Sequence, residues 1–122
     1  MSRIRPRREA AELLPLSPLL LQILLTLAAG KHHGYAIRRE IRERTGGMLD
    51  PGAGSLYGAI EKLLSEGAIE ESDERPDRHL DDQRRRYYRL TQFGRRVAIA
   101  EVERLRELVR FANGKFAQKG AV

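Results

Sequence analysis

Residues 54–67 constrain the fold of this chain more than any other stretch, and they read GSLYGAIEKLLSEG. On a helix with 3.6 residues per turn, the apolar side chains share one face, and they are Leu56, Ala59, Ile60, Leu63 and Leu64. The small, polar and charged residues share the other face, and they are Ser55, Gly58, Glu61, Lys62 and Ser65. Gly54 and Ser55 suit a helix start, where a serine hydroxyl can accept from a free N–H, and Gly67 suits a left-handed end. The pattern predicts a short helix with one buried face.

A second helix and a tight turn are predicted just before this stretch. The segment from Tyr35 to about Thr45 has Ile37 and Ile41 one turn apart, and Gly46-Gly47 closes it. The connection over residues 48–53 contains Asp-Pro-Gly, which is typical of a turn. Helix, tight connection and helix form a helix-turn-helix arrangement, in which the second helix meets DNA with its N-terminal end.

This arrangement suggests which side chains would contact DNA. In the 54–67 helix, Ser55 and Tyr57 are expected nearest the bases or their flanking phosphates, and Gly58 is expected to allow a close approach. Lys62 lies one to two turns on and is expected nearer the backbone. The preceding helix adds candidates for backbone contact, for which an ordinary solvated face is the equal alternative: Tyr35, Arg38, Arg39 and Arg42.

Length and charge narrow the class of protein. A chain of 122 residues is expected to be one domain, and the absence of cysteine excludes disulfides, thiolate metal sites and cysteine catalysis. The net charge of +6 favours an anionic partner, but residues 31–66 are almost neutral. A nucleic-acid interface must therefore rest on how the arginines are arranged there and cannot rest on bulk basicity.

The N-terminal third is expected to hold an arm and a buried helix. Residues 1–12 are predicted to be a basic, disordered arm, which could touch DNA or remain a solvated tail. The apolar run from Leu13 to Ala29 resembles a secretory signal peptide, but nearby acidic residues and two prolines argue against that alternative. The run is also too short and too interrupted to span a bilayer, so no membrane contact is expected. A buried helix is favoured, with Ser17 as its cap, Pro18 in its first turn and its end at Gly30.

Beyond Gly67 the apolar period changes from helical to alternating. Residues 68–72 and 85–90 are predicted to form two strands joined by a long polar loop over residues 73–83, which makes a hairpin or wing. Tyr87 and Tyr88 cannot share a face of a strand, so at least one is expected in the core and the other at a wing or interface contact.

The charge of the wing favours its base over its tip as the DNA contact. The loop carries five acidic residues against two arginines, and phosphate would repel such a surface. The base of the wing is basic and is expected to contact DNA through Arg84, Arg85 and Arg86.

A last helix is predicted from its cap, Thr91, to about Ala112, with Gly114 ending the regular part. Six apolar residues along it follow spacings of four and three, which is a heptad seam: Ala98, Val102, Leu105, Val109, Ala112 and Phe116. A homodimer is expected, although the seam could instead pack on the chain's own first helix. The expected interface comprises Leu19, Leu20, Ile23, Val102, Leu105, Val109 and Ala112.

Four motifs in this order resemble the PadR family of bacterial transcriptional regulators. They are LLLQILLTLAAG, HGYAIRREI, PGAGSLYGAIEKLLSEGAIE and RRRYYRLTQFGRR, and they span about residues 19–110. The resemblance implies a winged-helix repressor that dimerises through its C-terminal helix and binds a partly palindromic operator. The short tail is similar to the smaller subfamily, which has a single C-terminal helix.

Two positions depart from the family pattern. Gly52-Ala53 stands where the family usually has a serine and a proline, and Gly58 stands where a larger, often basic residue is common. Because Gly58 has no side chain to reach a base, shape readout of the DNA is expected to share the work of recognition.

The sequence as a whole predicts a mainly α protein with a small β-hairpin wing, acting in the cytoplasm on double-stranded DNA. Its expected parts are the arm (1–12), a winged helix-turn-helix domain (13–90), and a C-terminal dimerisation helix with its tail (91–122). The alternatives are a ligand-responsive sensor with a pocket in the dimer interface, and a protein-interaction module without DNA binding. No enzyme, cofactor or metal is expected, because no nucleophile–base set stands out and the adjacent His32 and His33 cannot both point at one ion.

Overall fold

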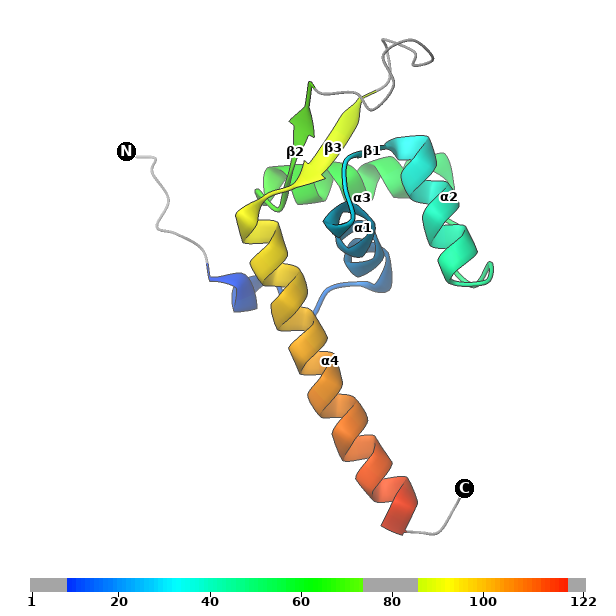
Figure 1. The fold of residues 1–122 in the computed structure, drawn as a ribbon, viewed down its shortest axis with the longest axis vertical. Helices are drawn as coiled ribbons and strands as arrows, with labels where there is room; N and C mark the ends of the chain where they lie inside the picture. The colour runs from blue at the N-terminus through cyan, green and yellow to red at the C-terminus, as the bar shows by residue number, and fades with distance from the viewer. Residues whose placement is uncertain (1–8, 74–85, 119–122) are drawn as a thin grey trace.

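The computed structural model describes residues 9–73 and 86–118, and its helices surround one central apolar helix (Figure 1). The elements run η1 (Ala10–Leu13), α1 (Pro18–Ala28), β1 (His32–His33), α2 (Gly34–Arg44), α3 (Ala53–Ser65), β2 (Ile69–Ser72), β3 (Tyr87–Leu90) and α4 (Gln92–Gln118). The expected class, mainly helical with a small antiparallel sheet in a winged helix-turn-helix, is confirmed.

The central helix is α1, and its start follows the prediction. The hydroxyl of Ser17 accepts a hydrogen bond from the N–H of Leu20 at 3.2 Å, and Pro18 occupies the first helical position. Helices α2, α3 and α4 and strand β3 all pack against α1. Within residues 9–73 and 86–118, no helix is long and apolar enough to cross a bilayer.

This central position corrects one expectation about the dimer. Leu20 and Ile23 were expected at a subunit interface, but their side chains are only 9% and 0% exposed and lie in the chain's own core. A helix that is apolar on most sides is covered on most sides by its own fold. Leu19 is half-buried and also packs against this core, whereas Leu25 is exposed.

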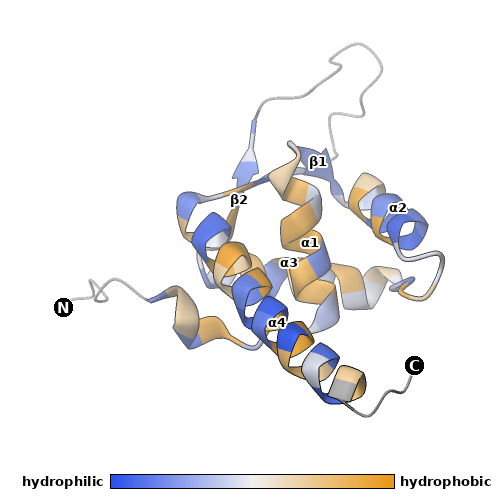
Figure 2. Cartoon of the chain, turned by 60° about the horizontal axis from the view of Figure 1, so that its bottom comes forward, coloured by the Kyte–Doolittle hydropathy of each residue, from blue (hydrophilic) through white to orange (hydrophobic). Residues whose placement is uncertain are grey.

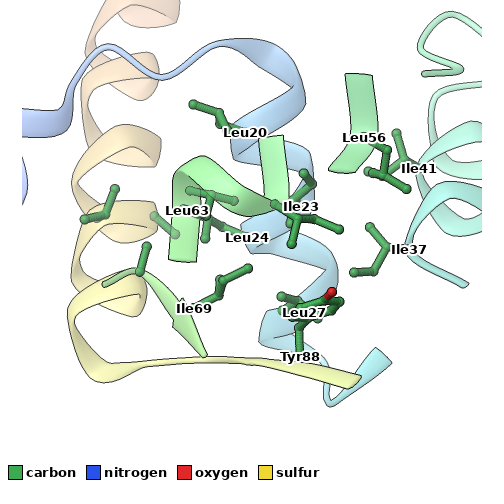
Figure 3. Packing of buried hydrophobic residues seen from close by; sticks show 14 residues of the cluster. Leu20, Ile23, Leu24, Leu27, Ile37, Ile41, Leu56, Leu63, Ile69 and Tyr88 are labelled. Atoms are coloured by element: carbon green, nitrogen blue, oxygen red, sulfur yellow. The ribbon is translucent and has the colours of Figure 1, made fainter. Parts of the chain in front are cut away.

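The core lies where α1 meets α2, α3, α4 and the sheet (Figure 3). Figure 3 shows Leu56 of α3 beside Ile41 of α2, and Leu63 beside Leu24 of α1. All the residues predicted on the apolar face of α3 are buried or half-buried, and all those predicted on its polar face are exposed. The face assignment of this helix is therefore confirmed.

The sheet has the order β1-β3-β2, and all its pairs are antiparallel. The strands β2 and β3 were predicted, but β1 was not, because two residues cannot show an alternating pattern. His33 pairs with Tyr87 across the ladder and also caps α2, since its Nδ1 accepts from the N–H of Ala36 at 3.2 Å. Both tyrosines of β3 are buried: Tyr88 faces the core, and Tyr87 meets the ring of His33 edge-on at 5.3 Å.

Two helix ends differ from expectation. Helix α3 begins one residue earlier, after Gly52, so Ser55 lies inside the first turn and is not the cap. Helix α4 begins as predicted, with the N–H of Gly94 donating to the Thr91 hydroxyl at 2.9 Å. However, it continues through Gly114 to Gln118. One glycine costs a helix only about 1 kcal/mol, which does not end it when its neighbours are good helix formers.

A buried carboxylate fastens the N-terminal segment to α4. Glu101 is 1% exposed, and its Oε2 accepts from the backbone N–H of Leu16 at 3.0 Å. Arg104 donates to both oxygens of the same carboxylate, at 2.6 and 2.9 Å. Residues 10–12, which the sequence placed in a disordered arm, form η1 together with Leu13 and pack against α4. The rest of that arm, residues 1–8, lies outside the described residues.

We expect the Glu101→Gln variant to be less stable at neutral pH by about 1–3 kcal/mol, the cost of losing hydrogen bonds to a charged group. The Arg104 hydrogen bond, aided by the Leu16 N–H and opposed by burial, lowers the pKa of Glu101 below its ordinary value of 4.5. A lowered folded-state pKa contributes stability above the unfolded value, and that stability is lost as the pH falls through the folded pKa. Urea unfolding across pH should therefore show the two proteins converging in acid, whereas a constant difference would contradict this assignment.

Candidate nucleic-acid interface

The outward face of α3 is small and unobstructed. Its exposed residues are Gly54, Ser55, Gly58, Glu61, Lys62 and Ser65, with the partly exposed ring of Tyr57 at its edge. A Cβ atom placed on Gly58 would meet no atom within 4 Å, so the backbone of the second turn can be approached closely from outside. A narrow, low surface of this kind fits into a groove more deeply than one covered by long side chains.

A cationic face of α2 lies next to the start of α3. Tyr35, Arg38, Arg39 and Arg42 are spaced by three and four residues, so they share one side of the helix. The guanidinium of Arg39 lies over the exposed ring of Tyr35, 5.7 Å from its centroid. Arg39 and Arg42 are exposed, which leaves their charges available to a partner.

Arg38 connects this face to the turn that leads into α3. Its Nη2 lies 3.3 Å from the Oδ1 of Asp50, two residues before the cap of α3. The Nε of Arg38 is buried without a hydrogen-bond partner. The ion pair partly neutralises Arg38, so this residue holds the turn in place while Arg39 and Arg42 supply the free positive charge.

Tyr57 lies between α3 and the start of α2. Its Oη and outer ring atoms lie against Gly34, the first residue of α2, and its expected contact with DNA stays a prediction. A Cβ atom on Gly34 would be 2.3 Å from that Oη. Tyr57 as a whole is 46% exposed. Sequence reasoning missed this contact, although a glycine at the first position of a helix was a possible signal of close approach.

The described base of the wing carries paired charges. Arg86 Nη1 lies 3.2 Å from Glu71 Oε2, and Arg89 Nε lies 2.7 Å from Glu70 Oε2 across β2 and β3. Exposed pairs of this kind contribute little to stability and can exchange for a phosphate partner. Arg84 and Arg85, which were also expected to contact DNA, lie with the acidic loop outside the described residues.

An aromatic row links the wing to α2, and the sequence did not reveal it. The ring of His33 stacks near Tyr35, with centroids 6.4 Å apart, and meets Tyr87 at 5.3 Å. Because His33 belongs to β1 and Tyr87 to β3, the row ties the start of α2 to the first residue of the second wing strand. The cationic face of α2 and the wing are therefore held in a fixed relation.

His32 has a structural role in the same region. Its Nε2 lies 2.8 Å from Glu40 Oε2 and its Nδ1 lies 2.9 Å from the carbonyl oxygen of Gly30. Within the part of the chain that the structure describes, no group of three histidine, aspartate or glutamate side chains could hold a metal ion. His79 lies outside that part.

An apolar surface lies away from α3, on α4. Six of the ten large apolar side chains that are exposed among the described residues belong to this helix: Ile99, Val102, Leu108, Val109, Phe111 and Phe116. Figure 1 shows the C-terminal half of α4 extending beyond the packed body, and Figure 2 shows apolar segments recurring along it. A groove of about 260 Å³ beside it is lined by Leu25 and Ala28 of α1 and by Ala98, Ile99 and Val102 of α4, among others.

Comparison with known proteins gives one family. The family model described as "Transcriptional regulator PadR-like family" matches residues 23–100. A transcriptional regulator from Clostridium thermocellum is 28% identical, with a TM-score of 0.66, covering 80% of this chain and 88% of its own. RosR from H. salinarum is 25% identical, with a TM-score of 0.62, covering 88% and 98%. A PadR family transcription regulator from Clostridium difficile shares the fold, with a TM-score of 0.69 at 22% identity, covering 82% and 99%. No curated protein matches this chain.

Proposed function

Because the chain belongs to the PadR-like family of transcriptional regulators, we propose that it is a cytoplasmic homodimer that binds a partly palindromic DNA operator sequence-specifically and acts as a repressor. The observation that carries this proposal is the open outer face of α3 beside the cationic face of α2. A groove-sized face flanked by free guanidinium groups matches a duplex, whose bases lie between two lines of phosphates.

In this proposal the N-terminal half of α3 enters the major groove. Ser55 and the backbone at Gly58 lie nearest the bases, and Lys62, which is 3.9 Å from Glu66, lies nearer a phosphate. Arg39 and Arg42 of α2 flank one strand, and the wing base with Arg84, Arg85 and Arg86 flanks the other. Few side chains would reach base edges, so the shape and deformability of the DNA would supply part of the specificity.

The dimer is proposed to form through α4. Its exposed apolar side chains and the neighbouring groove form a surface that a second copy of the chain can cover, which removes both from water. The interface residues that remain from the sequence prediction are Leu19, Val102, Leu105, Val109 and Ala112. The partners across the groove are Leu25 and Ala28.

The Val109→Asp variant should be monomeric at concentrations where the unmodified protein is dimeric. Val109 is 56% exposed in the single chain, so its replacement leaves the core intact. Each buried aliphatic side chain contributes about 1.5–3 kcal/mol, and the change occurs in both copies. The dissociation constant of the dimer should therefore rise about 100-fold or more. Sedimentation equilibrium at micromolar concentration measures this.

The matched control is Arg110→Asp, which adds the same side chain one residue away, outside the apolar seam. Its ion pair with Glu107 is exposed and contributes little, so the dimer should persist. A well-folded monomer for the unmodified protein would contradict the dimer, and recognition of a palindrome would fail with it.

Selection of bound fragments from random-sequence DNA tests the function itself. We expect enrichment of one partly palindromic motif, with affinity that falls steeply as salt rises. A protein-interaction module would enrich no motif and would shift no duplex at low salt.

A further inference from the structure

Helices α2 and α3 contact each other through a glycine on α2 and a tyrosine ring on α3. Tyr57 of α3 lies with its hydroxyl and outer ring atoms against the backbone of Gly34, where even a methyl group would come within 2.3 Å of the Oη and 2.7 Å of the Cζ. Gly34 is buried, and it is the first residue of α2. Gly34 and Tyr57 therefore fit each other as one space-filling unit between the two helices.

We propose that Tyr57 is a positioning residue whose ring sets the angle of α3 against α2, and that its hydroxyl reads no base. This inference rests on the proposed DNA-binding function and assigns a role within it. The preference for operator over random DNA would then depend on how Tyr57 packs, although Tyr57 lies beside the DNA-facing surface of α3 and not at its centre.

The geometry supports a spacer because Tyr57 fills the contact between α3 and the first residue of α2. Leu56 packs against the inner side of α2 near Ile41, towards the end of that helix (Figure 3). Arg38 ties the turn before α3 through Asp50. Tyr57 is the contact at the opposite end, over the first residue of α2. Without the ring, the first turns of α3, which carry Ser55 and Gly58, can shift against the start of α2. The core side chains Ile60 and Leu63 keep the rest of α3 in the core, so this shift tilts the helix about them.

The same geometry lets the role of the Tyr57 ring be tested separately from that of its hydroxyl. The Oη and the outer ring atoms of Tyr57 occupy the space that a Cβ atom on Gly34 would need. Removing only the oxygen keeps the spacer, whereas removing the ring destroys it. A methyl group at Gly34 displaces the ring without changing any residue of α3.

The experiment compares four variants and one control variant with the unmodified protein by fluorescence anisotropy, using the selected operator and a random duplex. Tyr57→Phe should keep the operator affinity within about threefold, whereas Tyr57→Ala and Gly34→Ala should each lower it roughly 3- to 30-fold and lower random binding less. The double variant Gly34→Ala/Tyr57→Ala should lose no more than Tyr57→Ala alone, because the two changes affect one contact. Gly114→Ala, with open space around it, is the control and should bind as the unmodified protein does.

Three results would overturn the inference: a loss with Tyr57→Phe equal to that with Tyr57→Ala, multiplied losses in the double variant, or full specificity in Gly34→Ala. A second measurement needs no DNA. Backbone amide NMR shifts at Leu63 and Leu64, far along α3 from both substitutions, should move in Tyr57→Ala and Gly34→Ala but not in Tyr57→Phe. Unmoved shifts there in all three variants would also overturn the inference. If the unmodified protein shows no operator preference, the proposed function fails, while the NMR comparison still decides the spacer.

Discussion

Replacing Gly94 with alanine should destabilise the fold by about 2–4 kcal/mol, although alanine is ordinarily the better helix residue. A Cβ atom on Gly94 would lie 1.9 Å from the carbonyl oxygen of Ala68 and 2.8 Å from its carbon. Both are backbone atoms at the start of β2, so neither can rotate away. The first turn of α4 must move off the sheet instead.

The displacement would break a specific junction. The carbonyl oxygen of Ala68 accepts from the N–H of Thr91 at 3.1 Å, and the Thr91 hydroxyl lies 2.7 Å from the carbonyl oxygen of Gly67. That hydroxyl also accepts from Gly94 as the cap of α4. Separating α4 from β2 therefore breaks the hydrogen bonds from Thr91 to the carbonyl oxygens of Ala68 and Gly67, and each lost bond adds to the cost of the overlap.

Gly114→Ala is the matched control, because it makes the same substitution in the same helix where nothing lies within 4 Å. It should stabilise the protein by up to about 1 kcal/mol. Thermal unfolding at equal protein concentration should give shifts of opposite sign, with a decrease of roughly 10 °C for Gly94→Ala. A stability of Gly94→Ala equal to that of the unmodified protein would show that the junction is looser than the structure has it.

Local patterns predicted the helices well because each such signal is carried by a few neighbouring residues. Ser17-Pro18 marks the start of α1, Thr91 caps α4, and Gly67 takes the left-handed conformation with a φ of 80° after α3. The apolar face of α3 was predictable because its spacing repeats over three turns. These features need no knowledge of what the helix packs against.

Long-range contacts were the features that the sequence could not supply. Strand β1 is only two residues long, and it exists because β3 pairs with it. Leu20 and Ile23 looked surplus to a small core, but four elements converge on α1 and bury them. A periodic pattern shows that a face is apolar, and it does not show whether the same chain or a second copy covers it.

The candidate interface was predictable as a region but not in its details. The arginine spacing of α2 and the open face of α3 follow directly from residue positions. The distinction between Arg38, which pairs with Asp50, and the exposed Arg39 depends on where the intervening turn lies. The orientation of Tyr57 depends on the space above Gly34, which is a property of two packed helices.

The second large effect is expected from Gly58→Asp, on the outer face of α3. An aspartate side chain fits there without overlap, and aspartate is no worse than glycine inside a helix, so folding should be unaffected. In the proposed complex, however, the new carboxylate would stand inside a groove lined by phosphates. Like charges brought together at an interface cost several kcal/mol, so affinity for the selected operator should fall about 100-fold or more.

The most direct test of DNA recognition by α3 is a competition between selected operator and random duplex, measured by anisotropy for three proteins with matched thermal stability. The unmodified protein and Gly114→Asp, which places the same charge on α4, should both prefer the operator. Gly58→Asp should lose the operator affinity and, with it, the preference. If Gly58→Asp binds and discriminates as the unmodified protein does, α3 does not read DNA and the account of this interface is wrong.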